Sequence, residues 1–326
     1  MVELTFSKIK TYCRLGQRGA IMGMAINDSA QLNPKLMVLT ADLALLSGLD
    51  RFIRMYPEQF INVGIAEQNM IGIAAGFAAE GLLPVATTYA TFVTMRSCEQ
   101  IRHFMGYMNL KIIVVGSGAG LVQGYSGNTH YTIEDISMMR AIPNMTILSP
   151  ADAGEAVKAF EAAQMCEGPV YIRLTGGLNC PIVYQKDYNF QIGKATILRE
   201  GRNITIFAAG TMVSTALKTS EILENNNITV RVVNMYSLKP VDIDVITNSC
   251  GSQLLVSIEE HNVMGGLGGI ISEVLSEISN SPVLLRLGIK DKFNLASDYE
   301  DLLSQNRLLP DQVAEDIVIK YNSLSL

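Results

Sequence analysis

The chain has 326 residues, which is enough for two ordinary α/β domains. Its net charge of -6 and the lack of any basic run argue against nucleic acid or an anionic membrane as a partner. Apolar residues make up 48% and charged residues only 17% of the sequence, so we expect part of the surface to be buried against other subunits.

Cysteine usage and hydropathy indicate the compartment. Five scattered cysteines without CxxC spacing predict neither a disulfide framework nor a zinc site. The N-terminus lacks the apolar core of a secretory signal, and no run approaches the roughly 20 apolar residues that span a bilayer. We therefore expect a cytoplasmic protein, and we predict no set of metal ligands within this chain.

Short runs rich in β-branched residues alternate with helical patterns in the first half of the chain. Strands are expected at 36–42, 84–90, 111–117, 145–150 and 168–174. Helices are expected from Glu67, over 98–108 and from Ala151. This alternation is typical of βαβ units and a parallel sheet.

A loop rich in Gly, Asn and Pro follows, and the alternation then restarts. Strands are expected at 204–211, 228–238, 254–261 and 282–289, and helices over 213–225, from Gly265 and from Pro310. The fold class is therefore expected to be α/β, with two consecutive domains at 1–185 and 190–326. Each should be a mainly parallel sheet flanked by helices.

The segment FINVGIAEQNMIGIAAGFAAEG (60–81) carries the most information. It places Glu67 at the start of a helix made almost entirely of Ala, Gly, Ile and Met, which we expect to be buried. A carboxylate there is costly to ionise unless another group pairs with it, so it is suited to holding and sharing a proton. The simpler interpretation is a glutamate that complements the dipole of its own helix.

The stretch GIAEQN (64–69), followed by TYATFVTMR (88–96), resembles the pyrimidine-binding domain of transketolases and 1-deoxy-xylulose-5-phosphate synthases. The resemblance implies thiamine diphosphate as the cofactor, with the carboxyl group of Glu67 on a ring nitrogen of its aminopyrimidine. It also implies that Phe92 stacks on that ring and that Tyr89 lines the pocket. Met95 stands where transketolases often carry another aromatic residue. Asp42 resembles an aspartate near the cofactor, although a loop cap after a strand is an equal alternative.

His130 lies in GLVQGYSGNTHYTIED (120–135), which is similar to the DGPTHQ segment of the same family. The resemblance implies that His130 contacts the hydroxyls of the ketose donor, as a second catalytic residue beside Glu67. Ser126 and Asn128 replace the usual Asp and Pro. Because the Asp helps to select the configuration of the sugar, we place Ser126 among the substrate-binding residues and leave the sugar open.

Two arginines match family positions that bind the substrate's anionic end. Arg173 closes the segment GPVYIRL, and Arg18 falls close to another such arginine. A guanidinium group suits a bidentate contact with an anion. A phosphate, a sulfonate or a carboxylate would fit these arginines equally well.

In the second half, SIEEHNVMGGLGG (257–269) is similar to the EEHNVIGGLG signature of transketolase C-terminal domains, and we interpret His261 as a packing or interface residue. The family's GDG motif for diphosphate and Mg²⁺ (or Ca²⁺) does not occur in the sequence. The resemblance thus implies an N-terminal partner subunit that carries this motif, an α2β2 heterotetramer, and transfer of a two-carbon ketol unit from a ketose, such as a sugar phosphate, to an aldose.

Three other functions share some of these sequence features. The β subunit of a 2-oxo-acid dehydrogenase decarboxylase shares the layout but typically has a histidine-serine pair where this chain has Thr129 and His130. A dinucleotide-binding oxidoreductase is suggested by KIIVVGSGAG (111–120), but the residues that follow do not form a helical pattern. A non-catalytic scaffold would not need Glu67, Phe92, His130 and Arg173 together.

Overall fold

Two sheets organise the chain in a computed structural model that describes residues 3–324. The strands of the first sheet are β1 (Leu36–Thr40), β2 (Phe60–Asn62), β3 (Leu83–Tyr89), β4 (Ile113–Ser117), β5 (Thr146–Leu148), β6 (Val170–Leu174) and β10 (Ser237–Lys239). Those of the second are β7 (Thr196–Arg199), β8 (Ile204–Ala208), β9 (Val230–Asn234), β11 (Leu254–Asn262) and β12 (Val283–Ile289).

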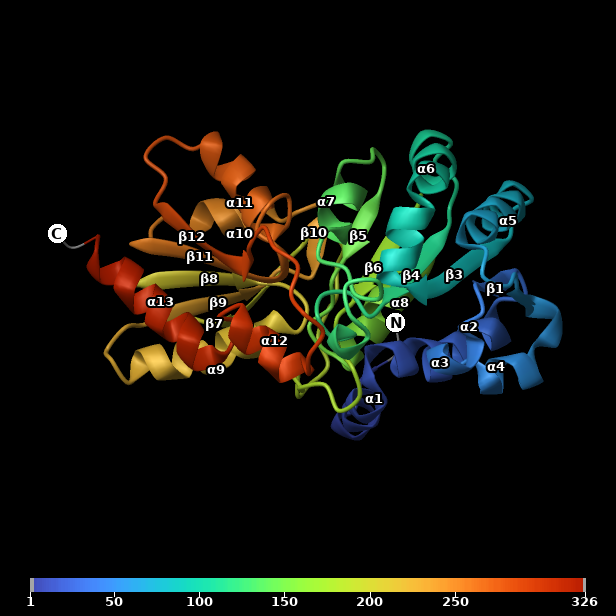
Figure 1. Ribbon diagram of the computed structural model, residues 1–326, viewed down its shortest axis with the longest axis horizontal. Coiled ribbons are helices and arrows are strands. Elements are labelled where there is room, and N and C mark those ends of the chain that lie inside the picture. Colours follow the sequence, from blue (N-terminus) through green and yellow to red (C-terminus); the bar gives the residue numbers. More distant parts are fainter. Residues whose placement is uncertain (1–2, 325–326) are drawn as a thin grey trace.

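The first sheet has the order β10-β5-β6-β4-β3-β1-β2, and the second has β12-β11-β8-β9-β7. All pairings are parallel except those of β10 with β5 and of β7 with β9. The predicted α/β class with two mainly parallel sheets is therefore confirmed. The sheets lie beside each other in the long direction of the molecule (Figure 1).

Helices cover both sheets. In the first half they are α1 (Phe6–Arg18), η1 (Gly19–Ala25), α2 (Ile26–Leu32), α3 (Ala44–Ser47), α4 (Asp50–Met55), η2 (Pro57–Gln59), α5 (Glu67–Ala79), η3 (Phe92–Arg96), α6 (Cys98–Gln100), η4 (Ile101–Tyr107), η5 (Gly124–Ser126), α7 (Asp135–Arg140) and α8 (Ala153–Met165). In the second half they are α9 (Met212–Glu224), α10 (Ile243–Asn248), α11 (Leu267–Ser276), α12 (Tyr299–Gln305) and α13 (Pro310–Asn322). No helix within residues 3–324 is both long and apolar enough to cross a bilayer.

One apolar core runs through both sheets. Met70 and Ile71 of α5 belong to the same buried cluster as Phe207 of β8 and Ile271 of α11. The short strand β10 follows β9 in the chain but joins the first sheet. The two halves therefore fold against each other. The proposed boundary at residues 185–190 divides the sequence into two α/β units, but apolar contacts and the pairing of β10 with the first sheet cross it.

The apolar helix α5 is buried on one face only. Met70, Ile71, Ala74 and Ala75 pack inward, whereas a side chain added at Gly72 or Gly76 would meet open space. The expectation that the whole helix is buried is wrong for the isolated chain, because α5 lies at the outer side of its sheet (Figure 1). An apolar helix with one open face is typical of a surface that another subunit covers.

Candidate active site

The carboxyl group of Glu67 is buried at the first residue of α5, with the residue only 5% exposed. Its Oε1 accepts a hydrogen bond from Nη1 of Arg96 at 2.7 Å. The buried carboxyl group is thus paired with a cation, which offsets part of the cost of burying it. The Arg96 side chain is 47% exposed, so this ion pair lies at the mouth of the site.

Arg96 makes a second contact that defines the site. Its guanidinium carbon lies 3.8 Å from the centre of the Phe92 ring, which is within the range of a cation–π contact. Both residues belong to the π-helical turn η3, and the side-chain amide of Gln68 donates a hydrogen bond to the Arg96 carbonyl at 3.0 Å. Residues at the start of α5 therefore contact both the guanidinium group and the backbone carbonyl of Arg96.

Three rings gather beside this ion pair. The ring centres of Tyr89 and Phe92 are 5.5 Å apart, and the His130 ring lies 5.6 Å from Phe92 and 6.2 Å from Tyr89. Tyr89 ends β3 and Phe92 begins η3, while His130 comes from a separate loop. Through Arg96, the structure brings together Glu67, Phe92, Tyr89 and His130.

The loop that carries His130 is fastened to the second half of the chain. Its turn has Gly127 at a positive φ of 79°, and the His130 amide donates to the Gly127 carbonyl at 3.0 Å. The Asn128 side chain donates to the carbonyl of Asn294 at 3.0 Å, and Thr129 Oγ1 lies 2.9 Å from His130 Nδ1. The loop that positions His130 therefore has contacts with the second half of the chain.

The other predicted residues lie at varying distances from this cluster. Met95 is exposed beside Arg96, and Ser126 ends the turn η5 in the His130 loop. Arg18 lines a small hollow of about 60 Å³ with Ser117, the strand partner of Tyr89. Asp42 has a φ of 57° and pairs with the side chain of Asn62 at the ends of β1 and β2, as a loop cap would.

Arg173 lies apart from the others. It is 2% exposed, and its Nε donates to Oδ2 of the fully buried Asp135 at 2.8 Å. Its Nη2 donates to the backbone carbonyl of Glu260 at 2.9 Å. Two of its nitrogens thus join the two halves of the chain, and its role in binding a substrate anion stays a prediction.

The EEH segment of β11 (259–261) lies at the same contact between the two halves of the chain. The Glu259 carboxylate accepts the amide hydrogens of Leu267 and Gly268 at the start of α11, and burial raises its pKa to about 7. Burial lowers the pKa of His261 to about 4, and its Nε2 accepts the amide hydrogen of Ile136 at 3.2 Å. His261 is fully buried between the halves, so its interpretation as a packing residue is confirmed.

Comparison with known proteins decides the family. The model of the transketolase pyrimidine-binding domain matches residues 18–180, and that of the transketolase C-terminal domain matches residues 193–305. A putative transketolase C-terminal section of Methanocaldococcus jannaschii is 37% identical over 285 residues, 87% of this chain and 89% of that protein. The chain belongs to the transketolase family.

Two further relatives bear on this transketolase-family chain. A 6-deoxy-6-sulfo-D-fructose transketolase subunit of a Clostridium species is 40% identical over 268 residues, 81% of this chain and 82% of that one. A solved structure described as a split gene transketolase, inactive beta4 tetramer, superposes with a TM-score of 0.84 at 38% identity. It covers 95% of this chain and 99% of its own, so the chain is similar to one half of a split transketolase.

Proposed function

We propose that this chain is the C-terminal half of a split transketolase that uses thiamine diphosphate to move a two-carbon ketol unit from a ketose to an aldose. The observation that carries the proposal is that Arg96 links Glu67 to Phe92, and that the rings of Tyr89 and His130 contact the Phe92 ring. A buried acid next to an aromatic ring is what an aminopyrimidine ring requires.

The contacts of Arg96 support the fit of this cofactor. Its planar guanidinium stacks on Phe92 and hydrogen-bonds Glu67, which are the two contacts proposed for the aminopyrimidine. A flat group with hydrogen-bond donors at its edge therefore fits between these side chains. We infer that Arg96 moves aside when the ring binds.

Each residue has a distinct role in the proposal. Bound thiamine diphosphate supplies the carbon nucleophile that attacks the ketose carbonyl. Glu67 holds a proton at a ring nitrogen, and its burial keeps water from competing for that proton. Phe92 and Tyr89 orient the ring. His130 hydrogen-bonds the hydroxyls of the donor sugar.

A partner subunit completes the site in this proposal. The sequence has no GDG motif for the diphosphate and Mg²⁺, and within residues 3–324 no cluster of three His, Cys, Asp or Glu could hold a metal ion. Exposed apolar side chains lie beside the site: Ile65, which lines a hollow with Glu67, is 77% exposed, and Met95, next to Arg96 in the chain, is 41% exposed. This apolar rim fits an N-terminal subunit seated over the site, in an α2β2 heterotetramer.

The substrate of this proposal is a ketose with an anionic end. Arg18, on the same sheet edge as Tyr89, is the arginine that remains available for that end, since Arg173 is buried. The Clostridium relative is named for a sulfonated ketose. We therefore propose that the donor is either a ketose phosphate or a sulfonated ketose, with Ser126 near its hydroxyls.

Mixing the purified chain with an N-terminal half that carries a GDG motif tests the proposal. The mixture, with thiamine diphosphate and Mg²⁺, is expected to transfer ketol units from a phosphorylated or sulfonated ketose, while each half alone is inactive. Ketol transfer is measured with a coupled assay for the aldose released. Full activity of the single chain would contradict the split enzyme, and pyruvate decarboxylation without ketol transfer would favour the dehydrogenase alternative.

Replacing Arg96 by methionine is expected to strengthen cofactor binding by up to roughly fivefold, because the ring no longer has to displace a partly exposed ion pair worth about 1 kcal/mol or less. The change is measured as the dissociation constant of thiamine diphosphate in the reconstituted complex, by calorimetric titration. Arg102→Met, on the exposed side of η4, serves as the matched control. Weaker binding in Arg96→Met would instead make Arg96 a ligand of the cofactor.

A further inference from the structure

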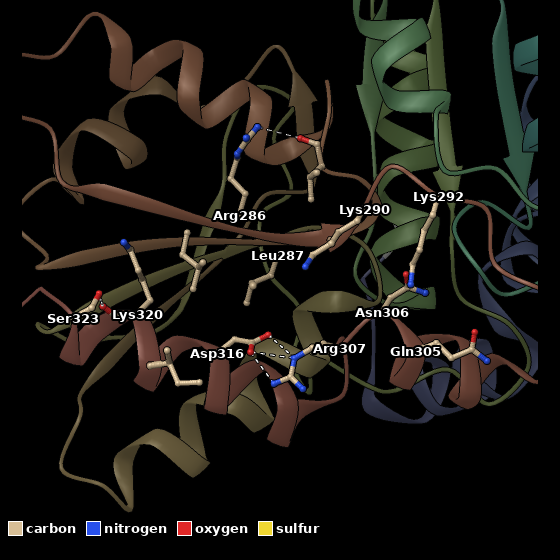
Figure 2. A pocket seen from close by; sticks show the side chains of 14 residues that line it. Arg286, Leu287, Lys290, Lys292, Gln305, Asn306, Arg307, Asp316, Lys320 and Ser323 are labelled. Carbon is tan, nitrogen blue, oxygen red and sulfur yellow. Dashed lines mark hydrogen bonds and ion pairs between the residues drawn. The ribbon is translucent and has the colours of Figure 1, made fainter.

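A second candidate site lies in the other half of the molecule. A groove of about 570 Å³ runs between the edge strand β12 and the helices α12 and α13 (Figure 2). This volume is typical of sites that bind small molecules. The groove shares no lining residue with the cluster around Glu67.

The lining of the groove is strongly cationic. It includes five basic side chains and one acidic one, Asp316; the basic ones are Arg286, Lys290, Lys292, Arg307 and Lys320. The whole chain has 25 basic and 31 acidic residues, so composition alone would not place such an excess of positive charge in one groove. A local concentration of this kind attracts anions.

The lysine amines are available to a ligand. Within residues 3–324, no carboxylate lies within ion-pairing distance of Lys290, Lys292 or Lys320. Lys290 and Lys292 follow the end of β12, and Figure 2 shows them on the side of the groove that faces Asn306 and Arg307. Two unpaired ammonium groups, those of Lys290 and Lys292, therefore approach one end of the groove.

Arg307 is held in place at that end. Its Nη2 lies 2.7 Å from both Glu315 Oε2 and Asp316 Oδ1. Its φ of 55° is left-handed, at a helix end where the amide of Leu308 reaches back to the carbonyl of Leu303. The two carboxylates thus pair with the Arg307 guanidinium, and the unpaired lysines are the groups that can contact the charge of a ligand.

The opposite part of the groove is apolar. Leu285 and Leu287 of β12 and Ile319 of α13 line it. An inorganic ion would leave this surface uncovered, and a long nucleic acid would be repelled by the net charge of -6. The ligand that fits is a small molecule with an apolar or aromatic body and several phosphate charges.

We propose that this groove binds a small organic polyphosphate of the nucleoside di- or triphosphate class. The phosphates contact Lys290 and Lys292, whose ammonium groups form charge-assisted hydrogen bonds. The ring system lies against Leu285, Leu287 and Ile319. This site is independent of the ketol-transfer proposal.

Titration with a fluorescent ATP analogue, followed by anisotropy, tests this site in the full chain and in the complex with its N-terminal partner. ATP and ADP are expected to displace the probe more effectively than AMP, adenosine or inorganic triphosphate. The dissociation constant should rise with ionic strength, since the contacts are between charges. Displacement by inorganic triphosphate as effective as by ATP would overturn the role of the apolar surface.

The double variant Lys290→Gln/Lys292→Gln is expected to bind the probe about tenfold or more weakly, because two charge-assisted contacts are lost. Both lysines are exposed, so folding should not change, and thermal unfolding checks this. Lys218→Gln, on the exposed face of α9, is the control and should bind as the parent does. Equal affinity in all three proteins would overturn the site, and probe binding that vanishes in the complex would assign the groove to subunit contact instead.

Discussion

Replacing Glu67 by alanine is expected to lower ketol transfer by the reconstituted complex roughly 10³-fold or more, which corresponds to about 4 kcal/mol of transition-state free energy. In the proposed reaction this carboxyl group, which is 5% exposed, is the one that exchanges a proton with the cofactor ring. Initial rates at saturating cofactor and donor measure the effect.

Two companion variants separate chemistry from structure. Glu67→Gln keeps the shape and one hydrogen bond but cannot hold the proton, so its rate should fall almost as far as that of Glu67→Ala. Glu80, exposed just after α5, offers a matched control, and Glu80→Ala should keep the parent rate. A Glu67→Ala complex that retains more than a tenth of the parent rate would contradict the proposed role.

The strands were predictable because the pattern that marks them is local. Buried parallel strands are continuous apolar runs, and β1, β3, β4 and β11 coincide with such runs. The sequence does not reveal which sheet a strand joins. Residues 228–238 look like one strand, yet the structure ends β9 at Asn234 and adds β10 to the other sheet. That choice depends on contacts with β5, far away in the chain.

The candidate site was predictable in part for a similar reason. Glu67, Phe92 and His130 come from segments with recognisable motifs, and the structure brings these side chains together. Arg96 stands in one of those segments and was given no role. A signal for it existed, because a carboxylate at the start of an apolar helix needs a cation and Arg96 follows Phe92 by four residues.

Arg173 has contacts that its motif did not indicate. Its place at the end of a strand matches the family position for an anion ligand, but its partners are Asp135 and the Glu260 carbonyl, which lie 38 and 87 residues away in sequence. A motif gives the end of a strand and does not show what packs over it. In this chain β11 covers that end, and the arginine joins the two halves.

Arg173→Met is therefore expected to destabilise the folded chain by about 3–5 kcal/mol, because it leaves the fully buried Asp135 carboxylate without its cation. The free energy of unfolding in urea measures this loss. Arg231→Met, which breaks the exposed pair of Arg231 with Glu200, is the control and should cost about 1 kcal/mol or less.

The double variant Arg173→Met/Asp135→Leu should recover part of the lost stability, since it removes both charges of the buried pair at once. Activity then distinguishes the two interpretations of Arg173. If it only joins the halves, the double variant in the complex keeps the parent KM for an anionic ketose at temperatures where it is folded. A KM that rises at least tenfold while the fold stays intact would return Arg173 to the substrate site.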